Sequence, residues 1–374
     1  MKYINCSKNK SILIVCPYPK DSAAGQRLKY EQYLKDWENL GYTIKISNFM
    51  DNNLWKILYK KGNFFKKIYG IFRGYIRRLR DIFSLGKYDI VYIFMWVTPF
   101  GTTFFERLFV LMSKKIIFDL EDNVLLKNTA RNKNSPNPLS FLLKNPNKQL
   151  FLVAKSNYVI TSSPALEEIC KKINIYSNAI YITSSVNTEK FRPKSFNENK
   201  KCVIGWTGTF SSKEYIQSIE DILQELAKKV DFQLHIIGNF DYKLDNVDLK
   251  VSQWNLKEEV KQMQTFDIGI YPLPDNDWVD GKSGLKAIQY LSFGIPTVAT
   301  NVGNTPNVIN HGEEGLLVKT KKEWVSALKK LITDKELRRQ MGKKARIKAE
   351  EKYSQKVVCD SYVKVLNLCS GKNL

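Results

Sequence analysis

The chain has 374 residues, which is enough for two domains of ordinary size. Its 59 lysine and arginine residues outnumber its 37 acidic residues, so the net charge of +22 predicts an anionic partner: nucleic acid, an anionic membrane or a phosphorylated substrate. Six cysteines without a C-x-x-C pair, together with only two histidines, argue against a zinc site and fit a reducing compartment.

The N-terminal part alternates short apolar runs with helical patterns. Residues 12–16 form the first apolar run, which is followed by the polar turn PYPKDSAAGQR and by a helical pattern that ends at Gly41. Further strands are expected at residues 43–47, 90–95, 116–118, 158–161 and 180–183. Continuous apolar runs separated by helices predict a parallel sheet covered on both faces. The longest apolar stretch, residues 90–105, is interrupted by Pro99 and Gly101, so we expect no membrane-spanning helix.

Residues 54–80 are the most basic part of the chain and contain no acidic residue. Aromatic and aliphatic side chains recur at helical spacing, which predicts a basic amphipathic helix. Its apolar face would enter the headgroup boundary of an anionic membrane while its cations contact the lipid phosphates. A helix packed on the core, with a solvated basic face, is the alternative. The cations expected at the membrane are Lys66, Lys67, Arg73, Arg77 and Arg78.

A polar segment at residues 186–201 separates this series from a second one and is predicted to be the interdomain linker. The second series has expected strands at residues 202–206, 232–237, 249–251, 267–271, 297–300 and 316–318, with a helical pattern at 216–230. Two Rossmann-like α/β domains in tandem follow, at residues 1–190 and 200–355. Such sheets bind ligands at the carboxyl ends of their strands, so loops of both domains would face one interdomain cleft.

Residues 280–300 combine a glycine-containing turn, a short helix and a strand. Asp280 and Ser283 are typical N-cap residues, and Gly294 closes the helix. Lys282 and Lys286 add positive charge where the helix dipole is already positive, which predicts an anion site with phosphate as the expected ligand. An ordinary capped helix with solvated lysines is the alternative.

Several stretches resemble the retaining family 4 glycosyltransferases of the GT-B fold, of the bacterial surface-polysaccharide type. The donor motif of that family is similar to DIGIYPLPDNDWVDGKSGLKAIQYLSFGIPTVATNVG at 267–303, and its first donor strand is similar to VIGWTGTFSSKEY at 203–215. The linker and the acceptor domain resemble VNTEKFRP and IIFDLEDNV. YSQKVVCDSYVKVLNL looks like the closing helix, so the resemblance implies that residues 356–374 pack back on the first domain.

The resemblance implies a nucleotide-sugar donor held mainly by the second domain, with no metal and no other cofactor. Its diphosphate would lie at Ser283, Gly284 and Leu285, and Lys282 would neutralise the departing nucleotide diphosphate. The other donor-binding residues implied are Gly208, Thr209 and Lys213 near the phosphates, Tyr271 and Leu273 at the nucleobase, Gln289 at the ribose, and Lys286 as a second cation.

The chain also departs from the family pattern. Counting back from Gln289, the first glutamate of the usual pair is replaced by Gly281, and no histidine stands near the reacting sugar in the first domain. An acidic cluster follows a strand of that domain and would orient or deprotonate the acceptor hydroxyl, or simply cap the strand. Its members are Asp119, Glu121 and Asp122. Gly25 and Arg27, after the first strand, are expected to approach the donor, although a solvated Arg27 is the alternative.

These observations predict an enzyme that transfers a sugar from a nucleotide-sugar to a hydroxyl of a glycan or lipid-linked acceptor, with retention, in cell-surface polysaccharide biosynthesis. We expect it in the cytoplasm, peripheral on the inner face of the plasma membrane. A sugar-nucleotide epimerase of the same fold and an inactive nucleotide-sugar or glycan-binding protein are the alternatives. A nucleic-acid partner is disfavoured, because the cations interleave with an apolar helical face and no recognised nucleic-acid-binding motif is present.

Overall fold

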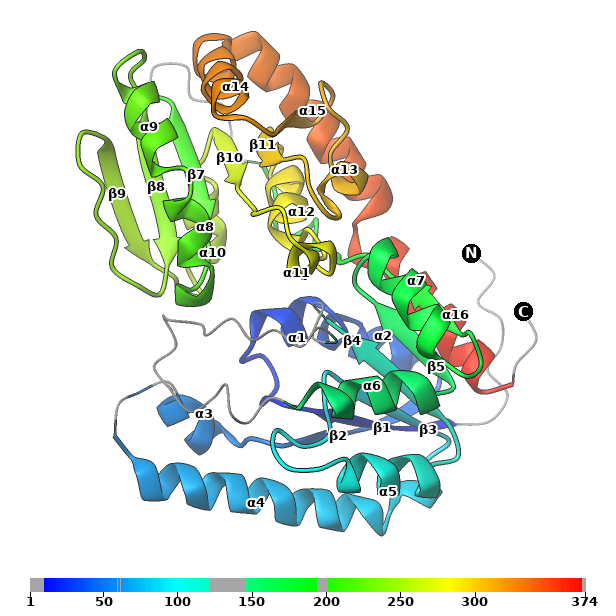
Figure 1. Ribbon diagram of the computed structural model, residues 1–374. Coiled ribbons are helices and arrows are strands. Elements are labelled where there is room, and N and C mark those ends of the chain that lie inside the picture. The colour runs from blue at the N-terminus through cyan, green and yellow to red at the C-terminus, as the bar shows by residue number, and fades with distance from the viewer. Residues whose placement is uncertain are drawn as a thin grey trace. The chain divides into compact units, whose positions relative to one another are not determined.

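The computed structural model describes residues 10–58, 60, 62–121, 125, 145–193 and 201–371. The chain divides into two compact units. Unit 1 comprises Met1–Thr183 with Val358–Leu374, and unit 2 comprises Ser184–Val357. Each unit contains one six-stranded sheet in which every pairing is parallel, with helices on its faces (Figure 1). The predicted α/β class with two parallel sheets is therefore confirmed.

The sheet of unit 1 has the strand order β2-β1-β3-β4-β5-β6. Its strands are β1 (Lys10–Cys16), β2 (Tyr42–Asn48), β3 (Ile90–Phe94), β4 (Ile116–Leu120), β5 (Tyr158–Thr161) and β6 (Ala179–Tyr181). Its helices are α1 (Ala24–Leu28), α2 (Leu34–Asn39), α3 (Asn52–Leu58), α4 (Phe64–Ile82), α5 (Phe104–Met112), α6 (Pro146–Lys155), α7 (Pro164–Ile173) and α16 (Gln355–Cys369), with 3-10 turns η1 (Glu31–Tyr33) and η2 (Leu85–Lys87).

The sheet of unit 2 has the strand order β12-β11-β10-β7-β8-β9. Its strands are β7 (Val203–Thr207), β8 (Gln233–Gly238), β9 (Asp248–Gln253), β10 (Ile268–Tyr271), β11 (Thr297–Thr300) and β12 (Gly315–Val318). Its helices are α8 (Lys213–Gln217), α9 (Glu220–Ala227), α10 (Glu259–Met263), α11 (Asp277–Asp280), α12 (Leu285–Ser292), α13 (Thr305–Val308), α14 (Lys321–Thr333) and α15 (Lys335–Lys352), and the 3-10 turn η4 (Phe210–Ser212) follows β7.

The two faces of the unit 1 sheet carry separate cores, as expected from the alternation of side chains along a buried strand. Ile12 and Ile14 face a cluster that includes Trp37 of α2 and Tyr362 of α16. Leu13 and Val15, between them in the sequence, face the opposite cluster, to which α4, α5, α6 and α7 contribute. Helix α16 is thus part of the core of unit 1, although it lies at the far end of the sequence.

The basic stretch, residues 54–80, includes parts of two helices. Helix α3 ends at Leu58, and α4 begins after Gly62 and Asn63, both of which have positive φ. Among the described residues, no helix is both long enough and apolar enough to cross a bilayer. The basic amphipathic helix predicted within residues 54–80 is confirmed as α4. Two successive left-handed residues separate it from α3, because they cannot continue a right-handed helix.

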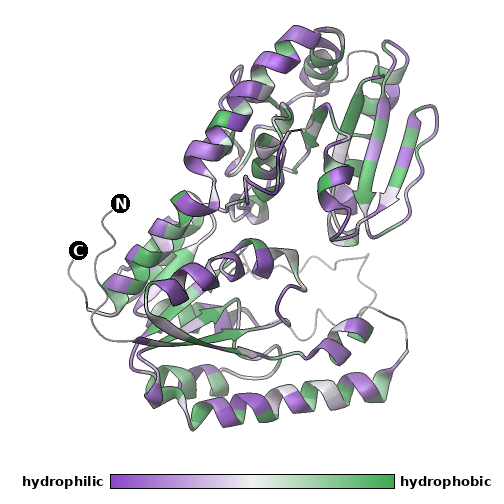
Figure 2. Cartoon of the chain, turned by 180° about the vertical axis from the view of Figure 1, so that it is seen from behind, coloured by the Kyte–Doolittle hydropathy of each residue, from purple (hydrophilic) through white to green (hydrophobic). Residues whose placement is uncertain are grey.

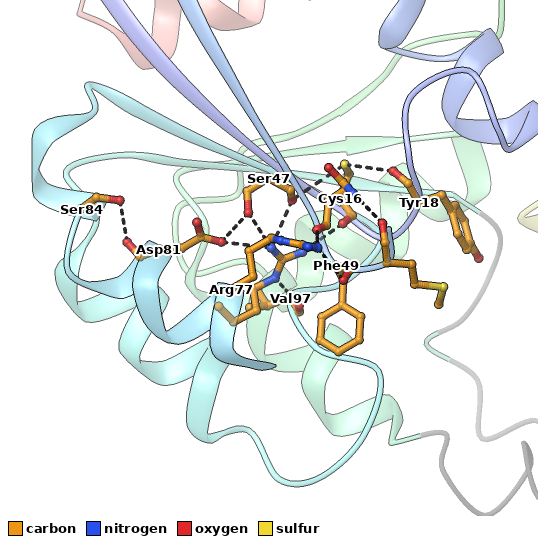
Figure 3. A network of polar contacts seen from close by, with 11 residues as sticks. Cys16, Tyr18, Ser47, Phe49, Arg77, Asp81, Ser84 and Val97 are labelled. Carbon is orange, nitrogen blue, oxygen red and sulfur yellow. Dashed lines mark hydrogen bonds and ion pairs between the residues drawn. The ribbon is translucent and has the colours of Figure 1, made fainter. Parts of the chain in front are cut away.

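Arg78 of α4 is fully buried, so its predicted exposure to a membrane is wrong. Its guanidinium donates to the carbonyl oxygens of Cys16 (2.9 Å), Ser47 (3.1 Å) and Val97 (2.7 Å), and it pairs with Asp81 at 3.0 Å. Figure 3 shows these partners around the ends of β1 and β2. Burial lowers the pKa of Arg78, and the Asp81 carboxylate opposes that effect. Arg78 therefore connects α4 by hydrogen bonds to the carboxyl ends of β1 and β2.

The Arg78→Met variant should lose about 3–5 kcal/mol of unfolding free energy in urea, because it leaves the Asp81 carboxylate and several carbonyl oxygens buried without their donor. The matched variant is Arg80→Met, whose side chain is exposed on the same helix. It should change stability by no more than about 0.5 kcal/mol. Equal stability of the two variants would contradict the structural role of Arg78.

Candidate functional site

Helix α12 begins directly after a glycine with left-handed backbone. Gly284 is its N-cap, with φ of 75°, and a Cβ there would lie 2.8 Å from Val308 Cγ2, so the position requires glycine. A glycine cap offers no side-chain oxygen to the first N–H groups of the helix, which form the positive end of its dipole. The predicted caps are wrong, because Asp280 lies in α11 and Ser283 contributes only its carbonyl oxygen, to Asn304.

Two lysines stand at this helix start. Lys286 Nζ lies 4.7 Å from the centre of the Trp206 ring and 3.3 Å from Ser212 Oγ. Burial, together with the positive charge of Lys282, lowers the pKa of Lys286 to about 7. The ammonium of Lys282 lies 5.3 Å from the centre of the Trp278 ring. Two nearby cations, both half-buried, repel each other, and a bound anion would relieve that repulsion. The arrangement is therefore suited to an anion.

The turn after β7 packs closely against the same lysine. A Cβ at Gly208 would lie 2.1 Å from the Trp206 ring and 2.7 Å from Ser212 Oγ, so this position also requires glycine. The Gly208 N–H donates to the carbonyl of Ile237 (3.0 Å), and the Thr209 N–H donates to Ser212 Oγ (3.1 Å). Both backbone N–H groups therefore bond within unit 2, and the prediction that Gly208 and Thr209 lie near the phosphates stays a prediction.

The remaining predicted donor residues lie on the same edge of the sheet or close to it. Lys213 is half-buried and donates to the carbonyl of Asp241 at 3.0 Å. Tyr271 and Leu273 are buried at the end of β10, where the Leu273 N–H donates to a threonine hydroxyl of β11 at 3.0 Å. Gln289 is buried on α12, one turn beyond Lys286. Both β10 and α12 therefore contribute to the region around the two lysines.

Tyr290 and Trp206 are site residues that the sequence analysis missed. The Thr207 N–H at the end of β7 donates to the Tyr290 hydroxyl at 3.1 Å. A Cβ at Gly269 of β10 would lie 2.5 Å from the Tyr290 ring, so the tyrosine packs directly on the strand backbone. Tyr290 thus holds α12 against two strands. The sequence offered only weak hints, namely a tyrosine next to Gln289 and a tryptophan next to the predicted loop.

Unit 1 has its own set of polar groups after β1. Gln26 exchanges hydrogen bonds with the backbone of Tyr18 and donates to Glu31 Oε1 at 2.6 Å, while the Asp21 N–H donates to Glu31 Oε2 at 3.0 Å. Asp21 has φ of 62°. Burial raises the pKa of Glu31, and the hydrogen bonds from Gln26 and Asp21 oppose that rise. Glu31 therefore fixes the conformation of the β1–α1 turn, a role that the sequence analysis did not anticipate.

The structure brings together two predicted residues of unit 1. A Cβ at Gly25 would lie 2.5 Å from Glu121 Oε2, so the carboxylate of Glu121 occupies the space that any other residue at position 25 would need. Arg27 is half-buried on α1, two residues further along. Asp122 lies outside the described residues. Among the described residues, Glu121 is the predicted acid whose carboxylate lies beside Gly25.

Asp119 lies elsewhere, in the interior of unit 1. It is fully buried, forms an ion pair with Lys29, and accepts a hydrogen bond from the Tyr92 hydroxyl. Lys29 also donates to the carbonyl of Leu120 at 3.3 Å. The prediction that Asp119 reaches a substrate is therefore wrong, because its carboxylate is occupied by a structural ion pair.

No group of three or more potential metal-ligating side chains was found in the part of the chain that the structure describes. Asp280 is the closest acid in sequence to Lys282, and burial and the charges of Asp277 and Asp275 raise its pKa. Taken separately, the described groups of unit 2 offer cationic chemistry, and those of unit 1 include carboxylates.

Residues 187–348, all of which lie within unit 2, match the family model described as glycosyl transferases group 1. Among curated proteins, the chain is similar to a D-inositol 3-phosphate glycosyltransferase of Arthrobacter sp. (strain FB24). The two are 23% identical over 304 residues, which cover 74% of this chain and 69% of that protein.

Solved structures resemble the chain over nearly its full length. Sucrose-phosphate synthase from Thermosynechococcus elongatus has a TM-score of 0.69 at 13% identity, covering 96% of this chain and 99% of that one. HepE of Anabaena, in a complex with UDP-glucose, has a TM-score of 0.64 at 13% identity, with coverage of 96% and 99%. With the two parallel six-stranded sheets, these neighbours identify the GT-B fold.

The pKa of Lys286 predicts how anion binding depends on pH. Above pH 7 the free protein holds Lys286 mostly neutral, so binding of pyrophosphate must take up a proton, and affinity falls as pH rises. Calorimetric titration of the wild type and of Lys286→Met should show an affinity ratio that declines between pH 7 and pH 9, by at most about tenfold per unit. Taking the ratio cancels the ionisation of the ligand. A ratio that does not change with pH would contradict this prediction.

Proposed function

Since the chain is a glycosyltransferase with the GT-B fold, we propose that it transfers a sugar from a nucleotide-sugar to a hydroxyl of a glycan or lipid-linked acceptor, with retention of anomeric configuration. The observation that carries the proposal is the pair Lys282 and Lys286 at the glycine-capped start of α12. Two cations and a helix N-terminus together suit the diphosphate of an activated sugar. The complex of the HepE neighbour with UDP-glucose supports the same class of donor.

In this proposal the diphosphate lies at Ser283, Gly284 and Leu285. As the bond between the sugar and the diphosphate breaks, negative charge grows on the leaving oxygen, and Lys282 stabilises it. Lys286 becomes fully protonated when the anion arrives, because the added negative charge raises its pKa. The two ammonium groups then serve where other transferases use a divalent metal, so we expect turnover in the presence of a chelator.

The nucleoside would lie along the edge formed by β10 and α12. Tyr271 and Leu273 are buried at the end of β10 and would line the nucleobase. Gln289 would hydrogen-bond the ribose hydroxyls from α12, because an amide both donates and accepts. Thr209 and Lys213 lie nearby in unit 2, and Gly208 supports them by allowing the tight turn beside Trp206.

On the acceptor side, Glu121 would orient the attacking hydroxyl or take its proton, and Arg27 and the backbone at Gly25 would contact the transferred sugar. Retention does not require an enzyme nucleophile in this fold, so a single carboxylate is sufficient for the proposal. An epimerase would convert the sugar nucleotide without any acceptor, and an inactive binding protein would not turn it over at all.

The biological setting that we propose is cell-surface polysaccharide biosynthesis on the cytoplasmic face of the plasma membrane, where a lipid-linked acceptor would be found. The name of the Arthrobacter relative favours a second candidate, in which the acceptor is a small phosphorylated polyol. The two candidates differ in which added acceptor stimulates release of nucleotide diphosphate. Stimulation by membrane lipid, and not by inositol phosphate, would favour the lipid-linked acceptor.

A set of sugar nucleotides should include one that protects the wild type against thermal unfolding, since a ligand at a hundred times its dissociation constant adds about 2.7 kcal/mol of stability. Lys282→Ala should lose most of that protection, because it removes a cation from the diphosphate site. The matched control is Lys257→Ala, an exposed lysine of the same unit, which should be protected like the wild type.

Two outcomes would count against the proposal. If no sugar nucleotide protects the wild type, the proposed function fails. If Lys282→Ala is protected as well as the wild type, the donor diphosphate does not bind at the start of α12.

A further inference from the structure

The face of α4 that packs on unit 1 is not its apolar face. The buried positions of this helix are Gly70, Gly74, Arg78, Asp81 and Ile82, which recur at three- and four-residue spacing. A Cβ at Gly74 would lie 2.6 Å from the ring of Phe49, and one at Gly70 would lie 3.0 Å from Leu54. The helix backbone therefore lies directly on the unit, and the apolar stripe that is visible in the sequence points elsewhere.

That stripe is exposed. Of the 17 exposed large hydrophobic side chains among the described residues, ten belong to α4, to the residue that follows it or to α5. Phe65 and Phe83 are each 83% exposed. Figure 2 shows hydrophobic and hydrophilic residues alternating along α4. The ten residues are Phe64, Phe65, Ile68, Tyr69, Phe72, Leu79, Phe83, Phe104, Leu111 and Met112, and we call them the α4–α5 surface.

The two helices form one surface because they pack side by side. Tyr75 of α4 lies 5.5 Å from Phe105 of α5, measured between ring centres, and its hydroxyl donates to the carbonyl of Phe100 at 2.9 Å. Ile82 of α4 and Phe109 of α5 enter the same core on one face of the sheet. Figure 1 shows both helices on that side of unit 1. Their side chains opposite this core therefore point the same way, away from the sheet.

The charges around the surface are positive. Lys66 and Arg80 are exposed on α4, and Arg73 is exposed with part of its charge offset by Asp51 at 3.3 Å. Lys67 is half-buried and donates to the carbonyl of Lys60 at 2.7 Å. Arg77, predicted at the membrane, is half-buried and donates to the carbonyl of Phe49 at 2.8 Å, so its guanidinium is less available there.

The acidic residues of both helices are buried. Asp81, the single acid of α4, pairs with Arg78, and Glu106, the single acid of α5, lies 3.2 Å from Lys148. Neither carboxylate reaches the surface. The exposed part of α4 and α5 thus combines aromatic and aliphatic side chains with cations alone.

We propose that the α4–α5 surface binds an anionic lipid bilayer at the depth of the headgroups. The apolar side chains would enter the boundary between headgroups and acyl chains, while Lys66, Arg73 and Arg80 contact lipid phosphates. Nucleic acid fits less well, because Ile68, Leu79 and Leu111 have no partner on a phosphate backbone. The inference rests on the proposed function in one respect: a lipid-linked acceptor would be located in the membrane that this surface binds.

Vesicle co-sedimentation tests the proposal with the full chain. The wild type should bind phosphatidylcholine vesicles that contain one third phosphatidylglycerol, and binding should weaken with salt and with the removal of phosphatidylglycerol. Phe65→Ser/Phe72→Ser should reduce the partition coefficient about tenfold or more, because two large apolar side chains no longer enter the bilayer. Leu111→Ser should reduce it too, since α5 belongs to the surface.

Matched controls come from the same unit. Ile175→Ser/Tyr176→Ser removes two exposed apolar side chains away from the surface and should leave the partition coefficient unchanged. Lys66→Gln/Arg80→Gln should lower binding to the anionic vesicles roughly tenfold. Lys171→Gln/Lys172→Gln, which removes the same charge from α7, should lower it much less.

The proposal is overturned if the wild type shows no preference for anionic vesicles, or if the phenylalanine variant binds them like the wild type. The wild type could also form a dimer that Phe65→Ser/Phe72→Ser dissociates without any change in vesicle binding. That result would show that the surface binds a second copy of the chain, and it would overturn the proposal as well. Protection by a sugar nucleotide, measured on the same preparations, separates the two hypotheses. Protection without vesicle binding removes only this inference, and vesicle binding without protection removes only the proposed function.

Discussion

The contact between α12 and the end of β7 is the interaction on which the proposed donor site depends. The Tyr290 hydroxyl accepts the Thr207 N–H, and the Lys286 ammonium lies over Trp206, so the helix start and the strand end are fixed against each other. Glycine at position 208 permits this approach, because any Cβ would strike the tryptophan ring. The repulsion between two lysines at such a rigid place is a cost in the free protein, and it becomes favourable interaction energy when an anion binds.

Buried and half-buried cations serve two different purposes in this chain, and their partners tell them apart. Arg78 meets an acid and several carbonyl oxygens, so its donors are matched and its role is to join a helix to strand ends. Lys29 likewise meets the carboxylate of Asp119. The described partners of Lys286 are a hydroxyl and an aromatic ring, both uncharged. Of these three cations, Lys286 is half-buried and is the one whose described partners include no carboxylate, so an anionic ligand can supply the missing negative charge.

The sequence predicted the sheets well, because a strand buried on both faces must be a short, continuous apolar run wherever it lies. It could not predict which cation of α4 is buried. Helical periodicity shows which side chains share a face of the helix, but not which face packs against the rest of the unit. Gly70 and Gly74, rather than the aromatic residues, mark the packed face. Asp119 was misassigned for a similar reason, since its partner Lys29 is distant in sequence and the ion pair exists only in the fold. The N-cap of α12 was also mispredicted from residue type alone. Asp280 and Ser283 are the better caps by type, but the cap in the structure is Gly284.

The net charge of +22 suggested an anionic partner but could not locate the partner's site. The proposed donor site uses two lysines, and other cations lie on helices such as α14 and α15, where acids are interspersed. Helices α4 and α5 differ because their acidic side chains are buried. Asp81 and Glu106 each pair with a cation of the same unit. Burying the acids leaves a local surface on which cations and apolar groups stand alone. The fold therefore gives this surface a local excess of positive charge, which the net charge of the whole chain does not reveal. The excess lies beside apolar side chains that a bilayer would accept.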